Sequence, residues 1–593
     1  MAEEDNLYSI FKNIASDDLN SIVSNIPTPR VLTFLKKTYQ FIMRALPQKT
    51  LQSLNTMFEK IIFLEDFKPL ESSGIVCCFC LDDPEEAKYV CEKFQTIPNY
   101  NKFLIMIPRI STLCQEIVER SGIKLQLLEY HLEIIPLDSF NFIVPSPKCF
   151  SHCFVEDDIS DVYTIARSLL KLELINGVPS RVFTAGDISS RVYTLVEEFK
   201  SQVGPAFLQS DPQIHEMFIV DRTVDLLTPL LTQFYYGGFL DDKYEINFGF
   251  MNLPDGVVLK RGGKTVKETL LADAEDEVFA EIRSMSCTDA GNRLRDLMNE
   301  MQTIKEKMTN TTGTSQWTVH AKRAKKLNEL APFVDMHFDI LEKLLQMHRY
   351  MKPMMNYEYA LMLREDPDTT LLKRLINSND ESDALRLLCL TSVISRGVPS
   401  SVLSDTQNRL ISKYGTAIVK DLINLGNAGL LVNEQSLFEK SKYPKFQTLD
   451  ETLKLVFQEP QIIKDENGTI EHTDVESGYD TYVPILLRLV QAGISGKWEK
   501  GTPVEKLMCQ MGVDHQIHGQ EWVRKVTAEG LAPKRILVFV IGGVTATEVM
   551  LLHQMGKIIF KGEVDIHVGS TNITTGKKLI NQVCPTIAKG APK

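Results

Sequence analysis

The segment MFIVDRTVDLLTPLLTQFYYGGFLDD, residues Met217–Asp242, decides how the rest of the chain is organised. It opens with consecutive apolar residues, which is the pattern of a buried strand. It then becomes charged at once, since Asp221, Arg222 and Asp225 follow directly. A charged cluster at the end of a buried strand serves either as an active-site loop or as a structural joint.

The composition sets the broad class of the protein. The chain has 593 residues, a formal charge of −12 and 44% hydrophobic residues. The length predicts about three to five domains, and the acidic balance argues against a general nucleic-acid binder. The first residues, MAEEDNLYSIFKN, are acidic and lack an apolar core, so we expect no secretory signal. No apolar run approaches the ~18 residues that a membrane span needs.

The cysteines form no disulfide framework. GIVCCFC, residues Gly74–Cys80, predicts a buried strand, because a free cysteine behaves as a small hydrophobe. Cys149, His152 and Cys153 lie close together, but a zinc site would need a second pair of ligands at matching spacing, and none follows. We expect structural thiols in both groups, reduced in the cytosol, and no metal site.

The first part of the chain alternates between strand and helix patterns, which indicates βαβ units on a parallel sheet. Residues 1–60 are predicted to be mainly helical, with a helix cap at Ser16-Asp17-Asp18. The strands that follow are predicted at Ile61–Leu64, Gly74–Cys80, Phe103–Pro108 and His131–Pro136, with helices at Pro84–Phe94 and Ser111–Ser121.

A second α/β region begins near Cys149, and its pattern returns at the end of the chain. Between the two pieces, helical patterns dominate from Thr265 to about Val456. The simplest arrangement lets the last piece complete the second α/β domain, with the helical block as a large insertion. The predicted elements are helices Ile159–Asn176, Ser189–Ser201 and Thr547–Gly556, and strands Met217–Val220, Arg535–Ile541 and Val564–Val568.

The segment IGGVTATE, Ile541–Glu548, resembles a phosphate-binding turn. A strand, two glycines and a helix start near Thr545 could cradle a phosphate. No lysine stands at the Walker position, and the fuller G-x-G-x-x-G spacing is missing. A tight strand-to-helix turn, in which Gly542 and Gly543 permit close packing, is the favoured interpretation.

The segment VDRTVD suggests a phosphatase or a magnesium site, because paired carboxylates bind Mg²⁺. However, Asp221 and Asp225 stand four residues apart and no D-x-D motif follows. The chain also lacks a G-x-S-x-G elbow and an H-E-x-x-H motif. We therefore expect a structural cluster, no cofactor and no enzyme activity.

The helical block contains a predicted αα-hairpin. Apolar residues at helical spacing face one side of each arm, and the polar stretch Thr309–Gln316 separates the arms. Both stripes face one core in the plainer interpretation, whereas in the other they offer a groove to a partner helix. The stripes are Leu294, Leu297, Met298, Met301, Ile304 and Met308, then Leu327, Leu330, Val334, Phe338, Leu341 and Leu345.

Two further features mark the second arm of the hairpin. A basic patch in an acidic protein can attract an acidic partner helix, although such a patch is more often only a solvated face. Pro332 removes a backbone donor, so it is predicted to bend or break the helix there. The patch consists of Lys322, Arg323, Lys325 and Lys326.

The opening segment resembles the signature of the Sec-one/Munc-eighteen (SM) family, cytosolic chaperones of SNARE-driven membrane fusion. In that signature a strand ends in Asp-Arg and leads to Asp-Leu, Thr-Pro-Leu and a Tyr-Gly/Glu-Gly run. VFVIGGVTATE (Val538–Glu548) and HVGSTNITTG (His567–Gly576) are similar to the family's C-terminal segments. The structural signature here is Asp221, Arg222, Asp225, Thr228, Pro229, Tyr236 and Gly238, with Gly542, Gly543, Thr545 and Glu548.

Within the family, the likeness is greatest to the class C vacuolar protein sorting subunits of the HOPS and CORVET tethering complexes. Three runs carry it: Pro108–Cys114, Leu385–Val393 and Ser477–Leu489. The N-terminal 60 residues match the family poorly, so the sequence leaves open whether the first domain binds a syntaxin N-terminal peptide.

The resemblance implies a three-domain arch of the α/β plus all-α class. Domain 1 covers residues 1–147, domain 2 covers 148–245 plus 477–593, and domain 3 covers 246–476. A SNARE-binding hairpin is expected at about 290–347. In this arrangement the Asp-Arg-Asp cluster is a joint where the chain leaves domain 2 for domain 3.

The implied function is to template SNARE assembly for endosome, lysosome or vacuole fusion and vesicle-mediated protein transport. The implied partners are syntaxin-type SNAREs, their assembled bundles and a helical HOPS/CORVET subunit, with no nucleic acid and only indirect recruitment from the cytoplasm to those membranes. Two alternatives stay open: an independent syntaxin-binding regulator of Golgi or endosomal traffic, and a nucleotide-binding enzyme that uses Gly542-Gly543. The expected SNARE-binding residues are Met301, Met308, Trp317, Lys322, Arg323, Lys325, Lys326 and Pro332.

Overall fold

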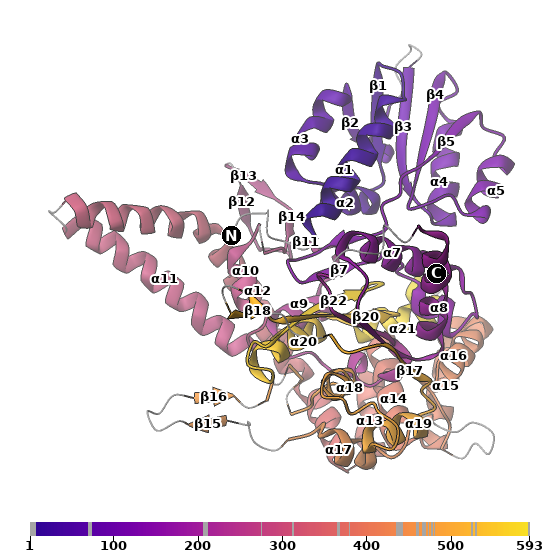
Figure 1. Cartoon of the computed structure of the whole chain (residues 1–593), viewed down its shortest axis with the longest axis vertical. Helices are drawn as coiled ribbons and strands as arrows, with labels where there is room; N and C mark the ends of the chain where they lie inside the picture. The colour runs from indigo at the N-terminus through magenta and orange to yellow at the C-terminus, as the bar shows by residue number, and fades with distance from the viewer. Residues whose placement is uncertain are drawn as a thin grey trace. The chain divides into compact units, whose positions relative to one another are not determined.

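The computed structural model divides into two compact units (Figure 1). Unit 1 comprises residues 1–145 with 246–250, and unit 2 comprises residues 146–245 with 251–593. The three domain boundaries predicted above stay a prediction. The structure describes residues 8–68, 74–204, 212–261, 263–273, 275–310, 314–364, 368–378, 380–434, 443–457, 462–464, 470–472, 474–475, 478–479, 481–522, 526–527 and 530–590.

Unit 1 is built on a five-stranded parallel sheet in the order β2-β1-β3-β4-β5. One face of the sheet is covered by α4 (Pro84–Gln95) and α5 (Thr112–Arg120), which bury a common core with β3 and β4. Asp83 and Ser111 cap these helices by accepting backbone N–H bonds, as N-cap residues do. The strands are β1 (Arg30–Phe34), β2 (Lys60–Phe63), β3 (Gly74–Leu81), β4 (Tyr100–Ile107) and β5 (Leu125–Glu129).

The helical start of unit 1 is only partly as predicted. The proposed cap at Ser16-Asp17-Asp18 is wrong, because these residues lie inside α1 (Ser9–Ser24). Strand β1 also interrupts the stretch predicted to be helical, since pairing with β2 and β3 on both sides decides the conformation of so short a run. The remaining elements of unit 1 are α2 (Lys36–Ala45), α3 (Gln48–Met57), η2 (Leu64–Asp66), β6 (Ile135–Pro136), β7 (Asn141–Ile143) and β10 (Ile246–Asn247).

Unit 2 contains a second sheet, and the C-terminal segment supplies its centre. Five of its strands lie in the order β17-β8-β9-β20-β22. Strand β20 (Lys534–Ile541) is parallel to both β9 (Glu216–Asp221) and β22 (Val564–Ser570), so residues more than 300 positions apart form one core. Strand β8 (Arg181–Ala185) is parallel to β9, and β17 (His515–Gly519) is antiparallel to β8.

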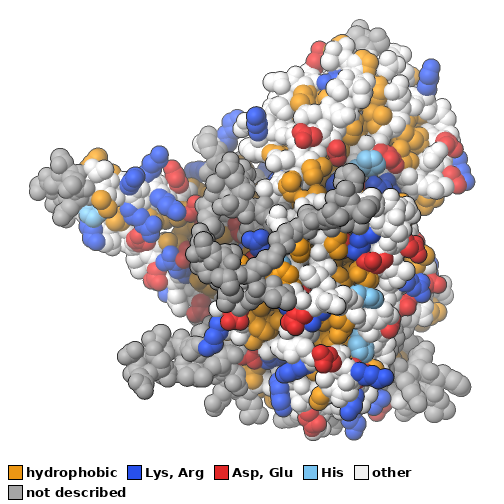
Figure 2. Space-filling model, viewed as in Figure 1, with side chains coloured by type: hydrophobic (Ala, Val, Ile, Leu, Met, Phe, Trp, Pro, Cys, Tyr) orange, Lys and Arg blue, Asp and Glu red, His pale blue; other side chains and the backbone are white. Residues whose placement is uncertain are grey.

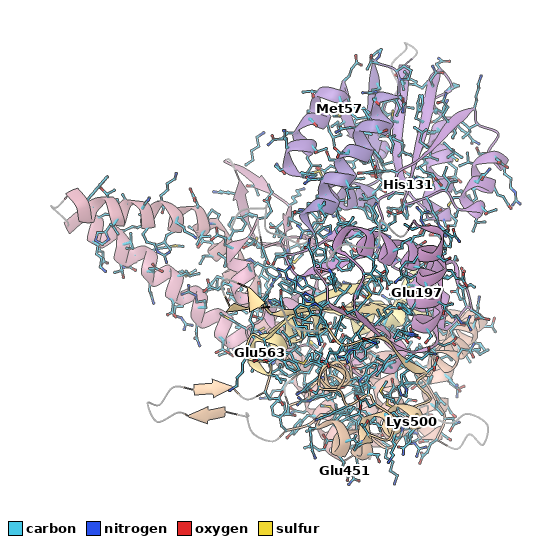
Figure 3. The ribbon with its side chains drawn as sticks, viewed as in Figure 1. Met57, His131, Glu197, Glu451, Lys500 and Glu563 are labelled. Carbon is cyan, nitrogen blue, oxygen red and sulfur yellow. The ribbon has the colours of Figure 1, made fainter. Side chains whose placement is uncertain are left out.

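Helices flank this sheet, and Figure 3 draws the side chains of the sheet and of these helices. Glu197, labelled there on α8, forms an ion pair with Lys200, which also reaches Glu173 of α7. The helices of this part are α6 (Cys149–Phe154), α7 (Ser160–Asn176), α8 (Asp187–Gln202), α9 (Tyr236–Lys243), α18 (Ile485–Ile494), α19 (Pro503–Gln510), α20 (Ala546–Ile558), α21 (Gly576–Val583) and α22 (Pro585–Lys589).

The predicted helical block begins later than expected, because short strands come first. These are β11 (Phe250–Asn252), β12 (Leu259–Arg261), β13 (Lys264–Val266) and β14 (Glu268–Leu270). The helices that follow are α10 (Glu277–Ile282), α11 (Cys287–Asn310), α12 (Thr314–Arg364), α13 (Thr369–Ser378), α14 (Glu381–Ser395), α15 (Ser400–Tyr414), α16 (Ile418–Asn427) and α17 (Phe446–Leu453). None of the helices within the described ranges combines the length and apolarity that a membrane crossing requires.

Candidate functional site

The charged cluster of the opening segment is buried in unit 2. Asp221 ends strand β9, and its carboxylate accepts the backbone N–H groups of Ile188 and Ser189 at 2.9 and 2.8 Å. These amides belong to the first turn of α8, where a carboxylate satisfies donors that the helix leaves free. Gly186 precedes the helix with φ +117°, and a Cβ there would lie 2.1 Å from Asp221 Oδ2. Burial raises the pKa of Asp221 to about 7, against the two amides that lower it.

Arg222 is the hub of the cluster. Its Nη1 donates to both carboxylate oxygens of Glu548 at 2.9 Å, and its Nη2 lies 3.4 Å from Asp225 Oδ2. Its Nε donates to the backbone carbonyl of Asp225 at 2.8 Å. The two facing carboxylates keep the pKa of Arg222 above its usual value although burial opposes them. The guanidinium therefore holds the end of β9 against helix α20.

The side chain of Asp225 accepts hydrogen bonds from two backbone N–H groups and one hydroxyl. Its side chain accepts the N–H and hydroxyl of Thr228 at 3.0 and 2.6 Å, which closes the turn that contains Pro229. It also accepts the N–H of Leu486 at 3.0 Å, at the start of α18. The carboxylate thus organises its own loop and caps a helix that lies more than 250 residues later in the chain.

Glu548 completes the joint on the side of the C-terminal segment. It forms a capping box with Thr545, whose hydroxyl accepts the N–H of Glu548 while Glu548 accepts the N–H of Thr545. Burial raises the pKa of Glu548, and Arg222 opposes this effect. We call Asp221, Arg222, Asp225 and Glu548 the polar joint; each side chain is at most 2% exposed, so the cluster offers no surface to a substrate.

The Gly542-Gly543 turn is filled by the chain itself. A Cβ on Gly543 would lie 2.3 Å from Asn572 Oδ1, and one on Gly542 would lie 3.0 Å from Arg222 Cβ. Three amides in and after the turn, which a phosphate would use, already have acceptors within the protein. The N–H of Gly542 bonds to Thr571 Oγ1, that of Val544 to the Asn572 carbonyl, and that of Thr547 to Gln233 Oε1. This turn is a close-packing turn and not an open phosphate cradle.

The same signature segment anchors the helical block at two points. Thr232 donates its N–H and hydroxyl to the carboxylate of Glu358 on α12, both at 3.0 Å, and Glu358 also pairs with Arg386 of α14 at 2.8 Å. Tyr236 on α9 lies 2.8 Å from Nδ1 of His337, also on α12. Nε2 of His337 lies 2.9 Å from Asp276, which caps α10.

Gly238 is required by close packing. It lies in α9, where a Cβ would approach Thr547 Oγ1 to 2.2 Å and Gln233 Oε1 to 2.6 Å. Gln233 is itself fixed, because its Nε2 donates to Asp242 at 3.1 Å and its Oε1 accepts the N–H of Thr547. The glycine therefore lets α9 approach the first turn of α20.

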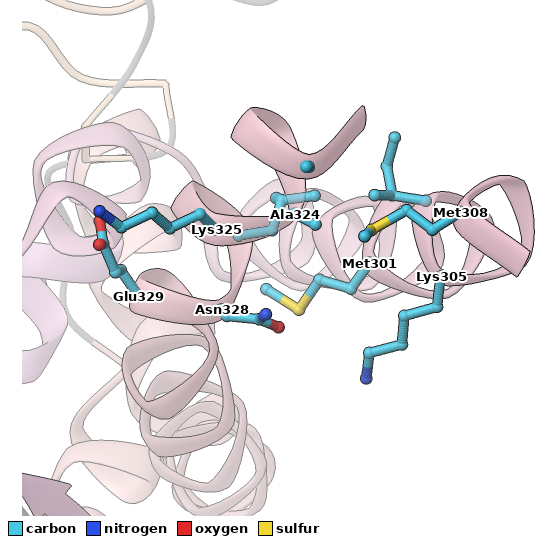
Figure 4. A pocket seen from close by; sticks show the side chains of 10 residues that line it. Met301, Lys305, Met308, Ala324, Lys325, Asn328 and Glu329 are labelled. Carbon is cyan, nitrogen blue, oxygen red and sulfur yellow. The ribbon is translucent and has the colours of Figure 1, made fainter. Parts of the chain in front are cut away.

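Helices α11 and α12 form the expected hairpin, which projects from the rest of unit 2 (Figure 1). Part of the two apolar stripes faces inward, since Leu294, Leu297, Leu327 and Val334 are at most 2% exposed. Phe338 and Leu345 are each 38% exposed, so the predicted stripe of α12 is wrong at these two positions. Towards the tip the arms leave a groove of about 430 Å³ between them (Figure 4). Its lining includes Met301, Ile304, Lys305 and Met308 from α11, and Ala324, Lys325, Asn328 and Glu329 from α12.

The four predicted cations of α12 differ in their surroundings. Arg323 pairs with Glu300 of α11 at 2.6 Å, and Lys326 pairs with Glu277 of α10 at 3.0 Å, so both help to hold the hairpin. Lys322 and Lys325 are exposed, and Lys325 also lines the groove. Figure 2 shows Lys and Arg side chains gathered on the hairpin, with Asp and Glu side chains beside them.

Trp317 and Pro332 are the other two hairpin residues predicted from the sequence. Trp317 is 48% exposed near the tip, whose residues 311–313 lie outside the described part of the chain. Pro332 does not break α12, which continues from Thr314 to Arg364. Packing on both sides, at the buried Leu327 and Val334, holds the helix across the hydrogen bond that proline cannot make.

The Sec1 family matches residues 30–582, which is most of the chain. The chain belongs to the Sec1 family. Its polar joint and its Gly542-Gly543 turn both lie within the matched part. The family assignment inferred from the signature is thereby confirmed.

Sequence relatives of this Sec1-family chain carry vacuolar sorting names. It is 26% identical to the vacuolar protein-sorting-associated protein 33 homolog of Arabidopsis thaliana, over 81% of this chain and 80% of that protein. It is 25% identical to the vacuolar protein sorting-associated protein 33A of Rattus norvegicus, over 81% of both chains. It is 22% identical to the 33B protein of Danio rerio over 93% of both.

Solved structures of Sec1-type proteins confirm the fold class. The SM protein Vps45 in complex with the Qa SNARE Tlg2 superimposes with a TM-score of 0.59 at 17% identity, covering 97% of this chain and 98% of that one. Unc18 in its complex with syntaxin 1 from Monosiga brevicollis gives 0.60 at 14% identity, covering 97% and 99%. The predicted combination of parallel-sheet α/β parts with a large helical part is correct.

Three tyrosines form hydrogen bonds around the polar joint, and the Sec1-family signature did not indicate these contacts. Tyr443 OH accepts the N–H of Leu226 at 2.8 Å, and Tyr482 OH lies 3.2 Å from Thr228 Oγ1. Tyr479 OH lies 2.5 Å from Thr545 Oγ1. Each tyrosine is distant in sequence from its partner, so no local spacing indicates the contact. Tyr479 and Tyr482 do lie in the run Ser477–Leu489 that carried the family resemblance, but nothing in that run indicates which group each hydroxyl contacts.

Proposed function

We propose that this chain is an SM-type SNARE chaperone that templates SNARE assembly in a tethering complex of the endosomal and lysosomal, or vacuolar, pathway. The groove of the α11–α12 hairpin is the single observation that carries this proposal, because it offers an apolar, methionine-lined surface between two helices. Flexible methionine side chains suit the binding of apolar helix faces of varied sequence. Family membership and the titles of the related complexes with Qa SNARE and syntaxin support the same partner class.

The mechanism is preorganisation. A SNARE bundle must bring separate flexible chains together in register, which costs translational and conformational entropy. A rigid hairpin that holds helices side by side lowers the remaining cost of starting the bundle. The hairpin is fixed at its base by Thr232 on Glu358 and by Tyr236 on His337, so it can act as a rigid support.

Binding of a preassembled SNARE core bundle to the purified chain tests the hairpin assignment. We expect Met301→Asp with Met308→Asp to weaken binding at least tenfold, because charge enters the apolar groove. Lys322→Glu with Lys325→Glu should mainly slow association, since exposed charges act on encounter more than on the bound state.

Ile423→Asp is the matched control, because Ile423 is 57% exposed on α16 in another part of unit 2. It should bind the bundle as the parent chain does. If the two methionine substitutions leave binding unchanged in a folded chain, the groove is not the binding surface.

The tethering complex is the finer part of the proposal and rests on the relatives named vacuolar protein sorting-associated protein 33. We propose HOPS or CORVET membership through a helical subunit, and peripheral recruitment of a cytoplasmic protein to late endosome, lysosome or vacuole membranes. The alternative is an independent syntaxin regulator, which the likeness in fold to Vps45 keeps open.

Affinity capture of the tagged chain from its own cells, followed by mass spectrometry, separates these two roles. Recovery of large helical and propeller-containing tethering subunits, with SNAREs in smaller amount, supports complex membership. Recovery of one syntaxin without tethering subunits assigns the chain to the independent class and leaves the hairpin proposal to be decided by the binding assay.

A further inference from the structure

Helices α6 and α7, beside the polar joint, bring together three side chains that suit a metal ion. Cys149 and Cys153 lie one turn apart on α6, and their sulfur atoms are 3.9 Å apart. Asp161 lies in the first turn of α7, and its carboxylate and the two sulfurs all fall within 4.8 Å of one another. Both cysteines are buried, whereas Asp161 is partly exposed, so the cluster opens to solvent on one side.

We propose that Cys149, Cys153 and Asp161 bind one Zn²⁺ ion, with a fourth position open to water. Zinc–thiolate bonds of about 2.3 Å at the tetrahedral angle place two sulfur atoms about 3.8 Å apart. The observed separation of 3.9 Å therefore fits a shared ion without rearrangement of α6. Two thiolates select soft or borderline metals over Mg²⁺ and Ca²⁺, and three protein ligands with one open position form a frequent zinc arrangement.

His152 orients the carboxylate of this site. Its Nδ1 lies 2.9 Å from Asp161 Oδ2, so one carboxylate oxygen is held by the ring. Metal-binding carboxylates and their hydrogen-bonding partners are commonly arranged in this way, and loss of the partner weakens metal binding 10–100-fold. His152 is thus a positioning residue.

The proton balance of the site is simple. Zinc replaces the two thiol protons, which pass to the solvent, so binding strengthens as pH rises. The intervening segment carries Glu156 and Asp158 as well, so the local charge favours a cation.

The sequence argued against zinc at this place because no second Cys or His pair stands at matching spacing. The fold supplies the third ligand as a carboxylate from the next helix instead. The site also touches the joint, since a Cβ on Gly542 would lie 3.0 Å from Phe154 and 3.2 Å from Phe150, both on α6. A bound ion would therefore brace α6 against the Gly542 turn.

Metal analysis of the full untagged chain, purified under reducing conditions, tests the proposal. We expect about one zinc per chain. In competition with a chromophoric chelator, Cys153→Ser should lose stoichiometric binding and His152→Ala should bind 10–100-fold more weakly. Co²⁺ added to the apo form of the parent chain should give an intense sulfur-to-cobalt charge-transfer band, which needs no variant to fold.

Cys509→Ser is the matched control. Cys509 is an exposed thiol that lies near Glu505 and His515 in the other cluster of this kind among the described residues. Its substitution should leave zinc content and the cobalt band unchanged. The proposal is overturned if the parent chain holds no zinc and gives no cobalt–thiolate band, or if Cys509→Ser removes the metal while Cys153→Ser retains it.

Discussion

The substitution Arg222→Met tests whether the polar joint holds unit 2 together. It removes the cation that Glu548 meets through two bonds of 2.9 Å and that Asp225 meets at 3.4 Å. Both carboxylates are at most 1% exposed, so they would be left in the interior without a positive charge to balance them. Removal of one member of a buried ion pair costs about 3–5 kcal/mol. Protonation of Glu548, whose pKa burial already raises, keeps the cost within this range.

Urea unfolding followed by tryptophan fluorescence measures this loss. All three tryptophans lie in unit 2, and Trp498 is buried against Phe183 and Phe218 of its sheet, so the signal reports that unit. The matched control is Arg191→Met, because Arg191 pairs with Asp187 at 2.9 Å on the exposed surface of α8. An exposed pair of this kind contributes about 0.5 kcal/mol or less.

The double variant Arg222→Met, Glu548→Gln gives a second, independent measure. Glutamine keeps an acceptor for the N–H of Thr545 but carries no charge, so the double variant should lose less than the two single losses added together. The coupling should be about 1–3 kcal/mol, as for residues in direct contact. The reasoning is refuted if the free energies of unfolding of Arg222→Met and Arg191→Met differ by less than about 1 kcal/mol, which is the size of an ordinary surface effect.

Three further changes probe other parts of the same region. Asp221→Asn should gain stability relative to the parent chain as pH rises from about 5 to 7, by up to about 1.4 kcal/mol per pH unit. The pKa of Asp221 is about 7 in the folded chain and higher than in the unfolded chain, so the folded state of the parent is favoured most while Asp221 is protonated. This contribution to stability is fully present below the unfolded pKa and is lost as the pH rises to about 7, whereas asparagine does not titrate. Urea midpoints at several pH values measure it, and a flat difference would mean that the carboxylate is ionised throughout. Gly238→Ala should cost at least about 1–3 kcal/mol in the same assay, because its Cβ would overlap Thr547 Oγ1 at 2.2 Å. Gly426→Ala in helix α16 separates this clash from the effect of losing a helical glycine, since a Cβ there would lie 3.7 Å from the nearest atom, the Leu431 carbonyl oxygen. Mg-ATP should give no thermal shift, whereas a ligand at 100 times its Kd would add about 2.7 kcal/mol; a saturable shift would restore the nucleotide alternative at Gly542-Gly543.

Sequence patterns predicted the parts of the fold that depend on local periodicity. The strands Gly74–Leu81 and Lys534–Ile541 contain continuous apolar runs and were predicted at Gly74–Cys80 and Arg535–Ile541, so these elements needed no tertiary information. Strand β1 was missed because its pairing on both sides, and not its composition, makes it a strand. The three-residue strands near residue 260 are too short to show a period of two.

For the polar joint, too, the sequence indicates the residues but not the distant groups that they contact. Asp221, Arg222 and Asp225 attract attention in the sequence, but their partners Glu548, Leu486 and Ser189 are identified only by the fold. The predicted break at Pro332 is wrong for a related reason, since α12 continues across the proline with Leu327 and Val334 buried on either side. The predicted bend stays a prediction. Asp161 beside Cys149 and Cys153 is a further contact that no spacing rule would have found.

The charged side chains of the polar joint are better explained by a role in fixing one relative orientation of β9, α18 and α20 than by a gain in stability. An apolar cluster of similar volume is often as stable as a buried ion pair, so stability alone does not explain these charges. Arg222 accepts few arrangements, because Glu548, Asp225 and the Asp225 carbonyl must all be met at once. The same segment then fixes α12 through Thr232 and Tyr236, so the orientation of the hairpin base follows from that of the joint. The templating role proposed above requires a groove in one geometry for the entropic gain to be kept, and a joint that fixes a single geometry would serve that requirement.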